Sequence, residues 1–322
     1  MPAGFCHKKY VSVPAFTNSP YGTLLNHHRE KNHLVKRVML VIENLFHKTT
    51  NIFNIFNVYD IKKMDIICPL CGSECSSYQI VTVRESRIIA CKRCTNARTF
   101  PQPHPLDYEN EDFHGQFKYK NVNDLPHQWK VGILKQIKII QHNMLVGDKV
   151  LEIGCGQGML LEELKKEGVD VVGIEPSVSG SLVASQKGLN IINDNFPSET
   201  LKGKKYDLII LAQVLEHIKD PGLFIDEILS ILSKKGKILF VQTNWKGLMP
   251  RFFKSSWYAW VPEQHYCHFT PKGLAYILEK KGCIVEKIEY YSLEHNMHII
   301  SQLANIIPRQ GDQFHLLVRY NN

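Results

Sequence analysis

Three glycines at alternate positions follow a hydrophobic run in the segment VLEIGCGQGML, residues 150–160. Glycines there let the backbone turn tightly and approach a ligand more closely than any side chain would allow. A dinucleotide-binding loop has the spacing G-x-G-x-x-G, but Met159 stands where its last glycine belongs. The spacing here is G-x-G-x-G over Gly154, Gly156 and Gly158, with Glu152 two residues before the first glycine. The spacing therefore argues against a dinucleotide as the ligand.

Acidic side chains stand at the ends of the next two predicted strands. Glu175 ends the run VVGIE, nineteen residues after Gly156. A carboxylate there can accept hydrogen bonds from both hydroxyls of a ribose; the alternative is a solvated acid at a strand end. Asp194 follows the run NIIN and is either a second ligand-binding acid or a plain turn residue.

Four cysteines have the spacing of a metal site. Two C-x2-C pairs, separated by nineteen residues, flank a strand-like run with a polar turn at Glu85–Ser86. Two such knuckles joined by a hairpin predict a zinc ribbon that is closed and structural, because four thiolates leave no position for water. The alternative is four unrelated buried thiols, and Cys75 is interpreted as a bystander. The predicted zinc ligands are Cys68, Cys71, Cys91 and Cys94.

The pattern E-x-G-x-G-x-G after a strand resembles the first motif of class I S-adenosylmethionine-dependent methyltransferases. The segment YDLIILAQVLEHIKDP, residues 206–221, resembles the fourth-strand motif of the ubiquinone-biosynthesis-like members of that family. Together the similar motifs cover residues 150–319. The resemblance implies S-adenosylmethionine as cofactor, a ligand that needs close backbone approach to its amino-acid moiety.

The same resemblance implies a role for each matching residue. Glu152 is expected near the amino group of the cofactor, and Asp194 is expected to receive the adenine amino group. Asn195 and Phe196 are expected to flank the adenine ring, and Gln213 to face the cofactor at its strand end. The complete cofactor-binding set is Glu152, Gly154, Gly156, Gly158, Glu175, Asp194, Asn195, Phe196 and Gln213.

Methyl transfer from a sulfonium is an in-line displacement, so the protein supplies alignment, desolvation and, for a protonated acceptor, a base. Glu216 and His217 are candidates, because they follow the fourth strand. The segment EQHYCHFTPKGL resembles a motif of methyltransferases in nucleotide-sugar and surface-polysaccharide pathways. In deoxysugar C-methyltransferases the matching base corresponds to His265, although Pro262 and Gln264 replace the tyrosine and glutamate of that motif.

Two further interpretations concern the same region. His217 has an alternative role in orienting its loop through the backbone, and His268 is interpreted as a packed or hydrogen-bonded histidine. The aromatic residues of 257–274 predict either a substrate lid or a hydrophobic plug under a long loop, and we favour the lid.

Alternating strands and helices predict an α/β fold with a doubly wound, mostly parallel sheet of seven strands, Rossmann-like, preceded by the small four-cysteine zinc ribbon. One of the last two strands is expected to be antiparallel. The strands are expected at 149–153, 170–174, 190–193, 206–212, 236–242, 284–290 and 313–319. The helices are expected at 157–167, 177–187, 221–233 and 271–281, with a further apolar stripe of helical spacing before the first strand, at Ile133, Ile137, Ile140 and Met144.

The expected organisation is a poorly ordered extension over 1–63, a zinc ribbon over 64–105, a connector and helix over 106–148, and a cofactor-binding domain over 149–322. The net charge of +8 is concentrated in the extension, which holds nine basic and three acidic residues. The remaining chain carries 30 basic and 28 acidic residues, which argues against a nucleic-acid partner. We expect a cytoplasmic protein, since no signal peptide or membrane span is evident.

The expected function is methyl transfer to a small molecule, with a nucleotide-sugar or surface-glycan precursor as the favoured acceptor. The zinc unit favours this interpretation, because deoxysugar C-methyltransferases also carry one ahead of the cofactor domain. The alternatives are an RNA methyltransferase whose ribbon recognises nucleic acid and a non-catalytic protein that binds S-adenosylmethionine. The sequence leaves open the acceptor atom and the oligomeric state.

Overall fold

The structure is a computed structural model that describes residues 66–75, 77–104, 119–145, 147–293 and 298–321. The predicted extension over residues 1–63 lies outside the described residues, as do residues 105–118 of the predicted connector. The side chain of Cys75 is also outside them.

A seven-stranded sheet forms the centre of the fold, in the order β12-β13-β10-β9-β6-β7-β8. Neighbours pair in parallel from β8 across to β10, whereas β13 runs antiparallel to both β10 and β12. This confirms the predicted doubly wound, mostly parallel sheet with one antiparallel strand near the end of the chain. The strands are β6 (Lys149–Ile153), β7 (Asp170–Ile174), β8 (Asn190–Ile192), β9 (Tyr206–Ala212), β10 (Leu232–Thr243), β12 (Cys283–Tyr291) and β13 (Gln313–Tyr320).

The strand order reverses beside β6. The chain winds outward from β6 to β8 and then returns to β9 on the other side of β6. In doubly wound sheets a ligand binds at the carboxyl ends of the strands at such a reversal. The ends of β6 and β9 are therefore where the site is expected.

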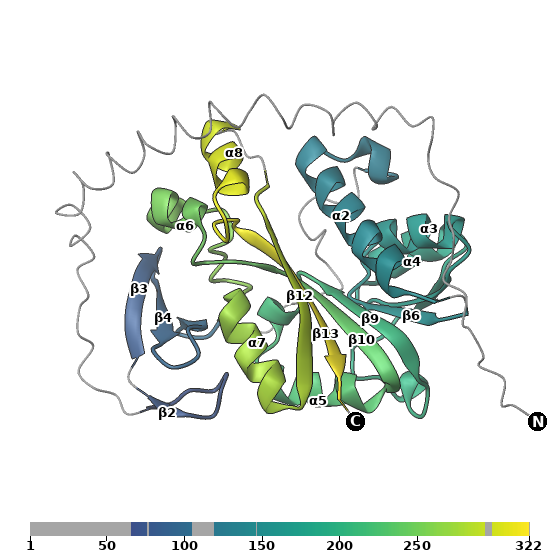
Figure 1. The fold of residues 1–322 in the computed structure, drawn as a ribbon, viewed down its shortest axis with the longest axis horizontal. Helices are drawn as coiled ribbons and strands as arrows, with labels where there is room; N and C mark the ends of the chain where they lie inside the picture. The colour runs from purple at the N-terminus through teal and green to yellow at the C-terminus, as the bar shows by residue number, and fades with distance from the viewer. Residues whose placement is uncertain (1–65, 76, 105–118, 146, 294–297, 322) are drawn as a thin grey trace, which may run out of the picture. The chain divides into compact units, whose positions relative to one another are not determined.

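Helices cover both faces of this sheet (Figure 1). Along β9, Leu208 and Ile210 belong to one buried cluster, and Ile209 and Leu211 to the other, because successive side chains of a strand point to opposite faces. The first cluster includes residues of α2 (His127–Asn143), α3 (Met159–Lys166) and α4 (Val178–Gln186), and the second includes residues of α5 (Pro221–Ser230) and α7 (Pro271–Lys280).

Most predicted boundaries hold within two or three residues. The strand expected over 236–242 begins four residues earlier, at Leu232, which pairs with Tyr206 of β9, so the helix expected over 221–233 already ends at Ser230. Two short helices were not predicted, α6 (Leu248–Phe253) and α8 (His298–Ile306). Thr270 caps α7, since its side chain accepts a hydrogen bond from the N–H of Gly273.

The cysteine-containing segment forms a separate, four-stranded antiparallel sheet in the order β11-β5-β4-β3. The hairpin turn consists of Arg84 and Glu85, one residue earlier than predicted, and Arg84 has a φ of 52°. The edge strand β11 follows β10 in the sequence, so a segment from the part of the chain that forms the large sheet completes the sheet of the cysteine-containing segment. Its strands are β3 (Ser77–Val83), β4 (Ser86–Cys91), β5 (Ala97–Phe100) and β11 (Cys267–His268), and the short pair β1 (Ile66–Ile67) and β2 (Glu74–Cys75) precedes them.

The aromatic segment of residues 257–274 is packed as a plug, so the favoured lid interpretation is wrong. Trp257, Trp260 and Phe269 are each at most 5% exposed. The two tryptophans join Ile88 of β4 in one hydrophobic cluster, which fills the space between the small sheet and α6. Burying such large apolar rings against the small sheet stabilises this arrangement by removing them from water.

Candidate active site

The glycine loop begins directly after β6. Gly154, Gly156 and Gly158 have φ values of 69°, 53° and 72°, in the left-handed region that other residues rarely adopt. A Cβ on Gly154 would lie 2.6 Å from a methyl carbon of Val214, and one on Gly158 would overlap the side chain of Leu189. The glycines are therefore required both by backbone conformation and by the close approach of neighbouring segments.

Glu175, at the end of β7, holds this loop. Its two carboxylate oxygens accept hydrogen bonds from the N–H groups of Gly156, at 2.7 Å, and of Ser177, at 2.9 Å. Burial raises the pKa of Glu175, and the two hydrogen bonds oppose that rise. A carboxylate has about four lone-pair positions, so two remain for the hydroxyls of a ribose.

Glu152 lies inside the sheet, on β6, immediately before the loop. It is 4% exposed, and its Oε2 atom has no hydrogen-bond partner among the described residues. Burial, together with the negative charge of Glu175, raises the pKa of Glu152 to about 8. A buried carboxylate without a counter-charge is costly, and the ammonium group of an amino-acid ligand would supply that charge. The glycine loop, Glu175 and Glu152 therefore fit S-adenosylmethionine.

Asp194, Asn195 and Phe196 follow β8. The side chain of Asp194 accepts hydrogen bonds from the N–H of Asn195, at 2.8 Å, and from the hydroxyl of Ser198, at 2.6 Å. The ring of Phe196 contacts that of Phe224 edge-on, with the centroids 5.1 Å apart. Asp194 thus stabilises a turn, and its adenine-binding role stays a prediction.

Gln213 ends β9 with a φ of 56°, an uncommon value for a residue other than glycine. Its side-chain amide donates to Oε1 of Gln313, at 3.0 Å. Gln313 in turn donates to the hydroxyl oxygen of Tyr258, at 2.5 Å. No sequence pattern indicates Gln313 or Tyr258 as a partner of Gln213, because only the antiparallel course of β13 brings Gln313 to this edge.

Glu216, His217 and His265 come together, although His265 is far from the other two in the sequence. A nitrogen or carboxylate oxygen from each lies within 4.8 Å of the others, and the two imidazole centroids are 4.7 Å apart. Glu216 and His217 belong to the 3-10 turn η5 (Leu215–His217), and His265 precedes β11. The three predicted catalytic residues therefore form one cluster at the end of β9.

The hydrogen bonds of this cluster fix part of its chemistry. Nδ1 of His265 lies 3.2 Å from the carbonyl oxygen of Ala259. Because a carbonyl only accepts, Nδ1 carries the proton, and Nε2 of the neutral ring carries the basic lone pair. Glu216 is 1% exposed, and burial raises its pKa to about 7, with the amide of Gln242 beside it. The carboxyl group of Glu216 can therefore exchange a proton near neutral pH.

The cluster also has the donor set of a cation site, with one carboxylate and two imidazoles. Such a set suits several divalent ions. His268, by contrast, is packed, as predicted: it is 2% exposed, its Nε2 lies 3.0 Å from the hydroxyl of Thr99, and burial lowers its pKa to about 3.

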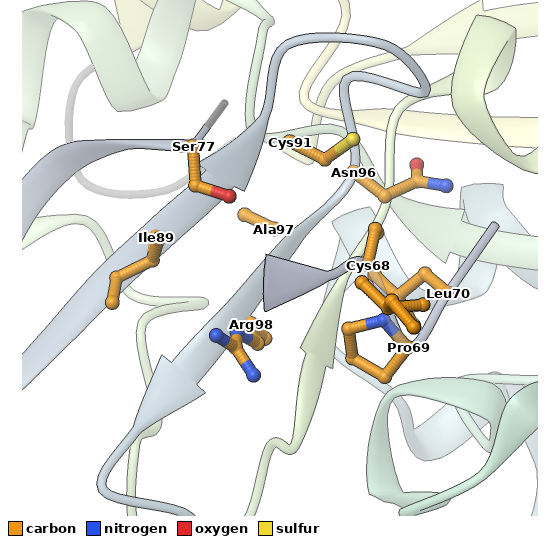
Figure 2. Close-up of a pocket in the computed structure, with 10 residues that line it drawn as sticks. Cys68, Pro69, Leu70, Ser77, Ile89, Cys91, Asn96, Ala97 and Arg98 are labelled. Carbon is orange, nitrogen blue, oxygen red and sulfur yellow. The ribbon is translucent and has the colours of Figure 1, made fainter. Parts of the chain in front are cut away.

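The four predicted zinc ligands converge. Their sulfur atoms all lie within 4.8 Å of one another, with Cys68 and Cys71 each 3.9 Å from a cysteine of the other pair, Cys94 and Cys91. Tetrahedral zinc with bonds of about 2.3 Å sets sulfur–sulfur distances of about 3.8 Å. The thiols therefore fit zinc. Figure 2 shows a pocket beside them, lined from both cysteine pairs.

The two cysteine pairs turn alike. Cys68 and Cys91 each accept, through the backbone carbonyl, a hydrogen bond from the residue four positions on, Gly72 and Thr95. Both of these residues have a left-handed φ, of 65° and 63°. The matched turns bring the pairs face to face.

A family model described as a methyltransferase domain matches residues 125–288, half of the chain. The chain belongs to this family. It is a class I S-adenosylmethionine-dependent methyltransferase, and the glycine loop, Glu175 and Glu152 described above lie inside the matched region. Within the described residues, no helix combines the length and the apolar character needed to cross a membrane.

Curated relatives include ubiquinone biosynthesis O-methyltransferases. That of Nitrobacter winogradskyi is 29% identical over 182 residues, 49% of this chain and 68% of the relative. That of Bartonella tribocorum is 31% identical over 131 residues, 39% of this chain and 51% of the relative. The methyltransferase thus spans about half to two thirds of the length of these relatives. Among solved structures, a SAM-dependent methyltransferase from Archaeoglobus fulgidus is 19% identical, with a TM-score of 0.49, over 64% of this chain and 98% of that one.

Proposed function

We propose that the protein transfers a methyl group to a hydroxyl-bearing small molecule, a nucleotide-sugar or surface-glycan precursor, with His265 as general base. The observation that carries this proposal is the hydrogen bond from Nδ1 of His265 to the carbonyl oxygen of Ala259, which directs the basic lone pair to Nε2. The nearby carboxyl group of Glu216 then stabilises the imidazolium that forms.

The proposed reaction needs little from the protein beyond alignment and a base. When bound, S-adenosylmethionine supplies an electrophilic methyl group on its sulfonium. Nε2 of His265 would accept the proton of the acceptor hydroxyl while that oxygen takes the methyl group, and the electron pair of the broken carbon–sulfur bond would stay on the departing thioether sulfur. Burial of the cluster excludes water from the reacting oxygen. His217 lies against the ring of His265 and restricts its orientation.

On the cofactor side, the proposal assigns the methionine ammonium to Glu152, the ribose to Glu175 and the adenine amino group to Asp194. Asn195 and Phe196 flank the ring, and Gln213 faces the cofactor. Because its glycines have no side chains, the backbone of the glycine loop can approach the amino-acid moiety of the cofactor closely.

The proposal also assigns one structural zinc ion to the four converging thiols, within a ribbon of residues 64–105. A connector and helix over 106–148 link the ribbon to the methyltransferase domain of 149–322. We place the protein in the cytoplasm, where a reducing environment keeps thiols available for a metal.

A second candidate acceptor is a hydroxyl-bearing precursor in ubiquinone biosynthesis, which the names of the curated relatives favour. RNA is disfavoured, because the near-neutral charge of residues 64–322 offers little attraction to phosphates.

The test is an untargeted transfer assay. Purified protein is incubated with methyl-labelled cofactor and a bacterial extract fractionated into nucleotide sugars, glycan precursors, quinone precursors and RNA. We expect label in the first two fractions; label confined to quinone precursors or RNA would move the acceptor assignment there.

The base assignment has its own test. His265→Asn should lower the transfer rate at least about 100-fold, since general bases contribute about 100- to 10,000-fold. Cofactor affinity, measured by calorimetry, should stay within about threefold, because His265 lies outside the glycine loop. His142→Asn, at the end of α2, is the matched control and should change neither quantity. Full transfer by His265→Asn would remove His265 as the base.

A further inference from the structure

The ribbon touches the candidate base directly, through a buried threonine. Thr99 of β5 is 0% exposed. Its backbone N–H donates to the carbonyl oxygen of Tyr266, at 3.1 Å, and its hydroxyl donates to that of His265, at 2.6 Å. Both the backbone and the side chain of one ribbon residue therefore hold the carbonyl groups of the histidine segment, residues 265–268.

The protons of this contact can be assigned. The Thr99 hydroxyl has one proton, and the carbonyl of His265 only accepts, so the proton lies on that bond. The hydroxyl oxygen must then accept from Nε2 of His268, 3.0 Å away. Nε2 of His268 therefore carries a proton, and burial, which lowers the pKa of His268 to about 3, keeps the ring neutral. One hydroxyl thus connects both histidines of the segment.

The opposite side of the histidine segment is fixed to the turn that carries Glu216. The N–H of Tyr266 donates to the carbonyl oxygen of Glu216, at 2.8 Å. The thiol of Cys267 lies 3.7 Å from the carbonyl oxygen of Ile218 and donates weakly to it. The segment therefore lies between β5 of the ribbon and η5, and its position sets the distance from His265 to Glu216.

The ribbon is itself docked close to this point. The side-chain oxygen of Asn96 accepts from the N–H of Thr270, at 3.1 Å. A Cβ on Gly273 would overlap both that oxygen and the carbonyl oxygen of Cys94. The second cysteine pair thus packs against the first turn of α7 with no room for a side chain.

We propose that Thr99 is a positioning residue for His265, so that the zinc ribbon completes the catalytic site. This inference rests on the proposed function, because it takes His265 as the base. The ribbon then acts through the backbone of residues 265 and 266, and Thr99 makes no contact with the reacting atoms.

The test compares Thr99→Val, which keeps the shape and removes the hydroxyl, with Thr99→Ser, which keeps the hydroxyl. Thr82→Val is the matched control, since Thr82 is exposed on β3 of the same sheet and its hydroxyl bonds only to Gln79 among the described residues. We expect Thr99→Val to lower kcat about 10- to 100-fold, the range that a displacement of about 1 Å produces. KM for the labelled fraction and cofactor affinity should stay within about twofold. Thr99→Ser should restore most of kcat.

A second measurement requires no acceptor. Nitrogen-15 spectra of histidine-labelled protein should show a protonated Nε2 on His268, protected from solvent exchange. Thr99→Val should remove that protection and shift the His265 ring resonances, whereas Thr82→Val should leave both unchanged.

The outcomes separate this inference from the proposed function. Wild-type kcat in a folded, zinc-loaded Thr99→Val variant would overturn the positioning role, even with His265→Asn inactive. Unchanged histidine spectra in that variant would also overturn it. Full transfer by His265→Asn would instead refute the base, whatever the Thr99 variants do.

Discussion

The cofactor side and the acceptor side of this methyltransferase are held together over very different distances along the chain. On the cofactor side, Glu175 binds the N–H of Gly156, 19 residues away. On the acceptor side, Thr99 binds the carbonyl oxygen of His265, 166 residues away. A local hydrogen bond within one strand-helix-strand unit depends on little else, whereas the long-range contact depends on the ribbon being folded. A substitution in the ribbon should therefore lower methyl transfer without changing cofactor affinity, and a substitution beside the glycine loop should lower cofactor affinity without changing the ribbon.

The largest expected separation comes from zinc. Replacing Cys94 with serine removes one of four thiolates from a site that contributes about 10 kcal/mol or more to folding when zinc binds. Releasing β5 should lower transfer at least about 100-fold through displacement of His265, while cofactor affinity stays within about threefold. Zinc content, transfer and calorimetry measure this.

The control for that variant is Cys283→Ser, which alters a buried thiol of β12 outside the cluster. It should retain one zinc ion per chain and nearly full transfer. If Cys94→Ser lowers cofactor affinity as much as transfer, the cofactor side also depends on the folded ribbon, and the proposed independence of the two sides is wrong.

Glu175→Ala should weaken cofactor binding and leave the zinc site intact, the opposite of what is expected for Cys94→Ser. It removes a carboxylate that holds the glycine loop and that is expected to bind the ribose, and each hydrogen bond to a charged group contributes about 1.5–3 kcal/mol. Cofactor affinity by calorimetry should fall about 100-fold or more. Zinc content should not change. Glu199→Ala, an exposed acid near the same sheet edge, is the control, and equal affinity in both variants would refute the role of Glu175.

The pH dependence of cofactor binding sharpens the role of Glu152. Its pKa of about 8 in the free protein means that the carboxyl group is mostly protonated at pH 6. A bound ammonium favours the carboxylate and lowers that pKa, so binding releases a proton and affinity rises with pH. Between pH 6 and 7.5 the rise should reach about 30-fold, the limit for one proton.

Calorimetry in buffers of different ionisation enthalpy counts the released proton directly. Glu152→Gln should bind more weakly and show no proton release. A wild-type affinity that stays flat over this pH range would mean that no cation approaches Glu152.

The smallest expected effect concerns Asp194. If its carboxylate also receives the adenine amino group, Asp194→Ala should weaken cofactor binding about tenfold, the equivalent of one hydrogen bond of about 1.4 kcal/mol. Ser198→Ala removes only the turn hydrogen bond and should cost less than about twofold. Equal losses in the two variants would leave Asp194 as a turn residue.

The sequence predicted the strands and the doubly wound, mostly parallel sheet, because their signals are local. The glycine spacing and the alternation of strands and helices each reflect a constraint within a short stretch of chain, whereas the cofactor-binding roles of Glu152, Glu175 and Asp194 stay predictions. The four cysteines were also predictable, since a tetrahedral thiolate site requires paired spacing.

The acceptor side could be predicted only as a set of residue types. His265, Glu216 and His217 were candidates, but nothing local indicates that Thr99 bonds to His265 or that Gln313 bonds to Gln213. Pairing of β5 with β11 is a long-range event, and strands of two to four residues carry too little pattern to predict it. For the same reason the aromatic residues predicted a lid, because the surface that buries them belongs to the ribbon.

The pairing of β5 with β11 also bears on how the chain is made. During synthesis, at about 5–20 residues per second, the 166 residues between Thr99 and His265 take about 8–33 s to appear. Throughout that interval β5 is an open edge of the small sheet, and an edge with unpaired backbone groups is a template for pairing with another chain. The ribbon edge is closed only when the ribosome delivers β11.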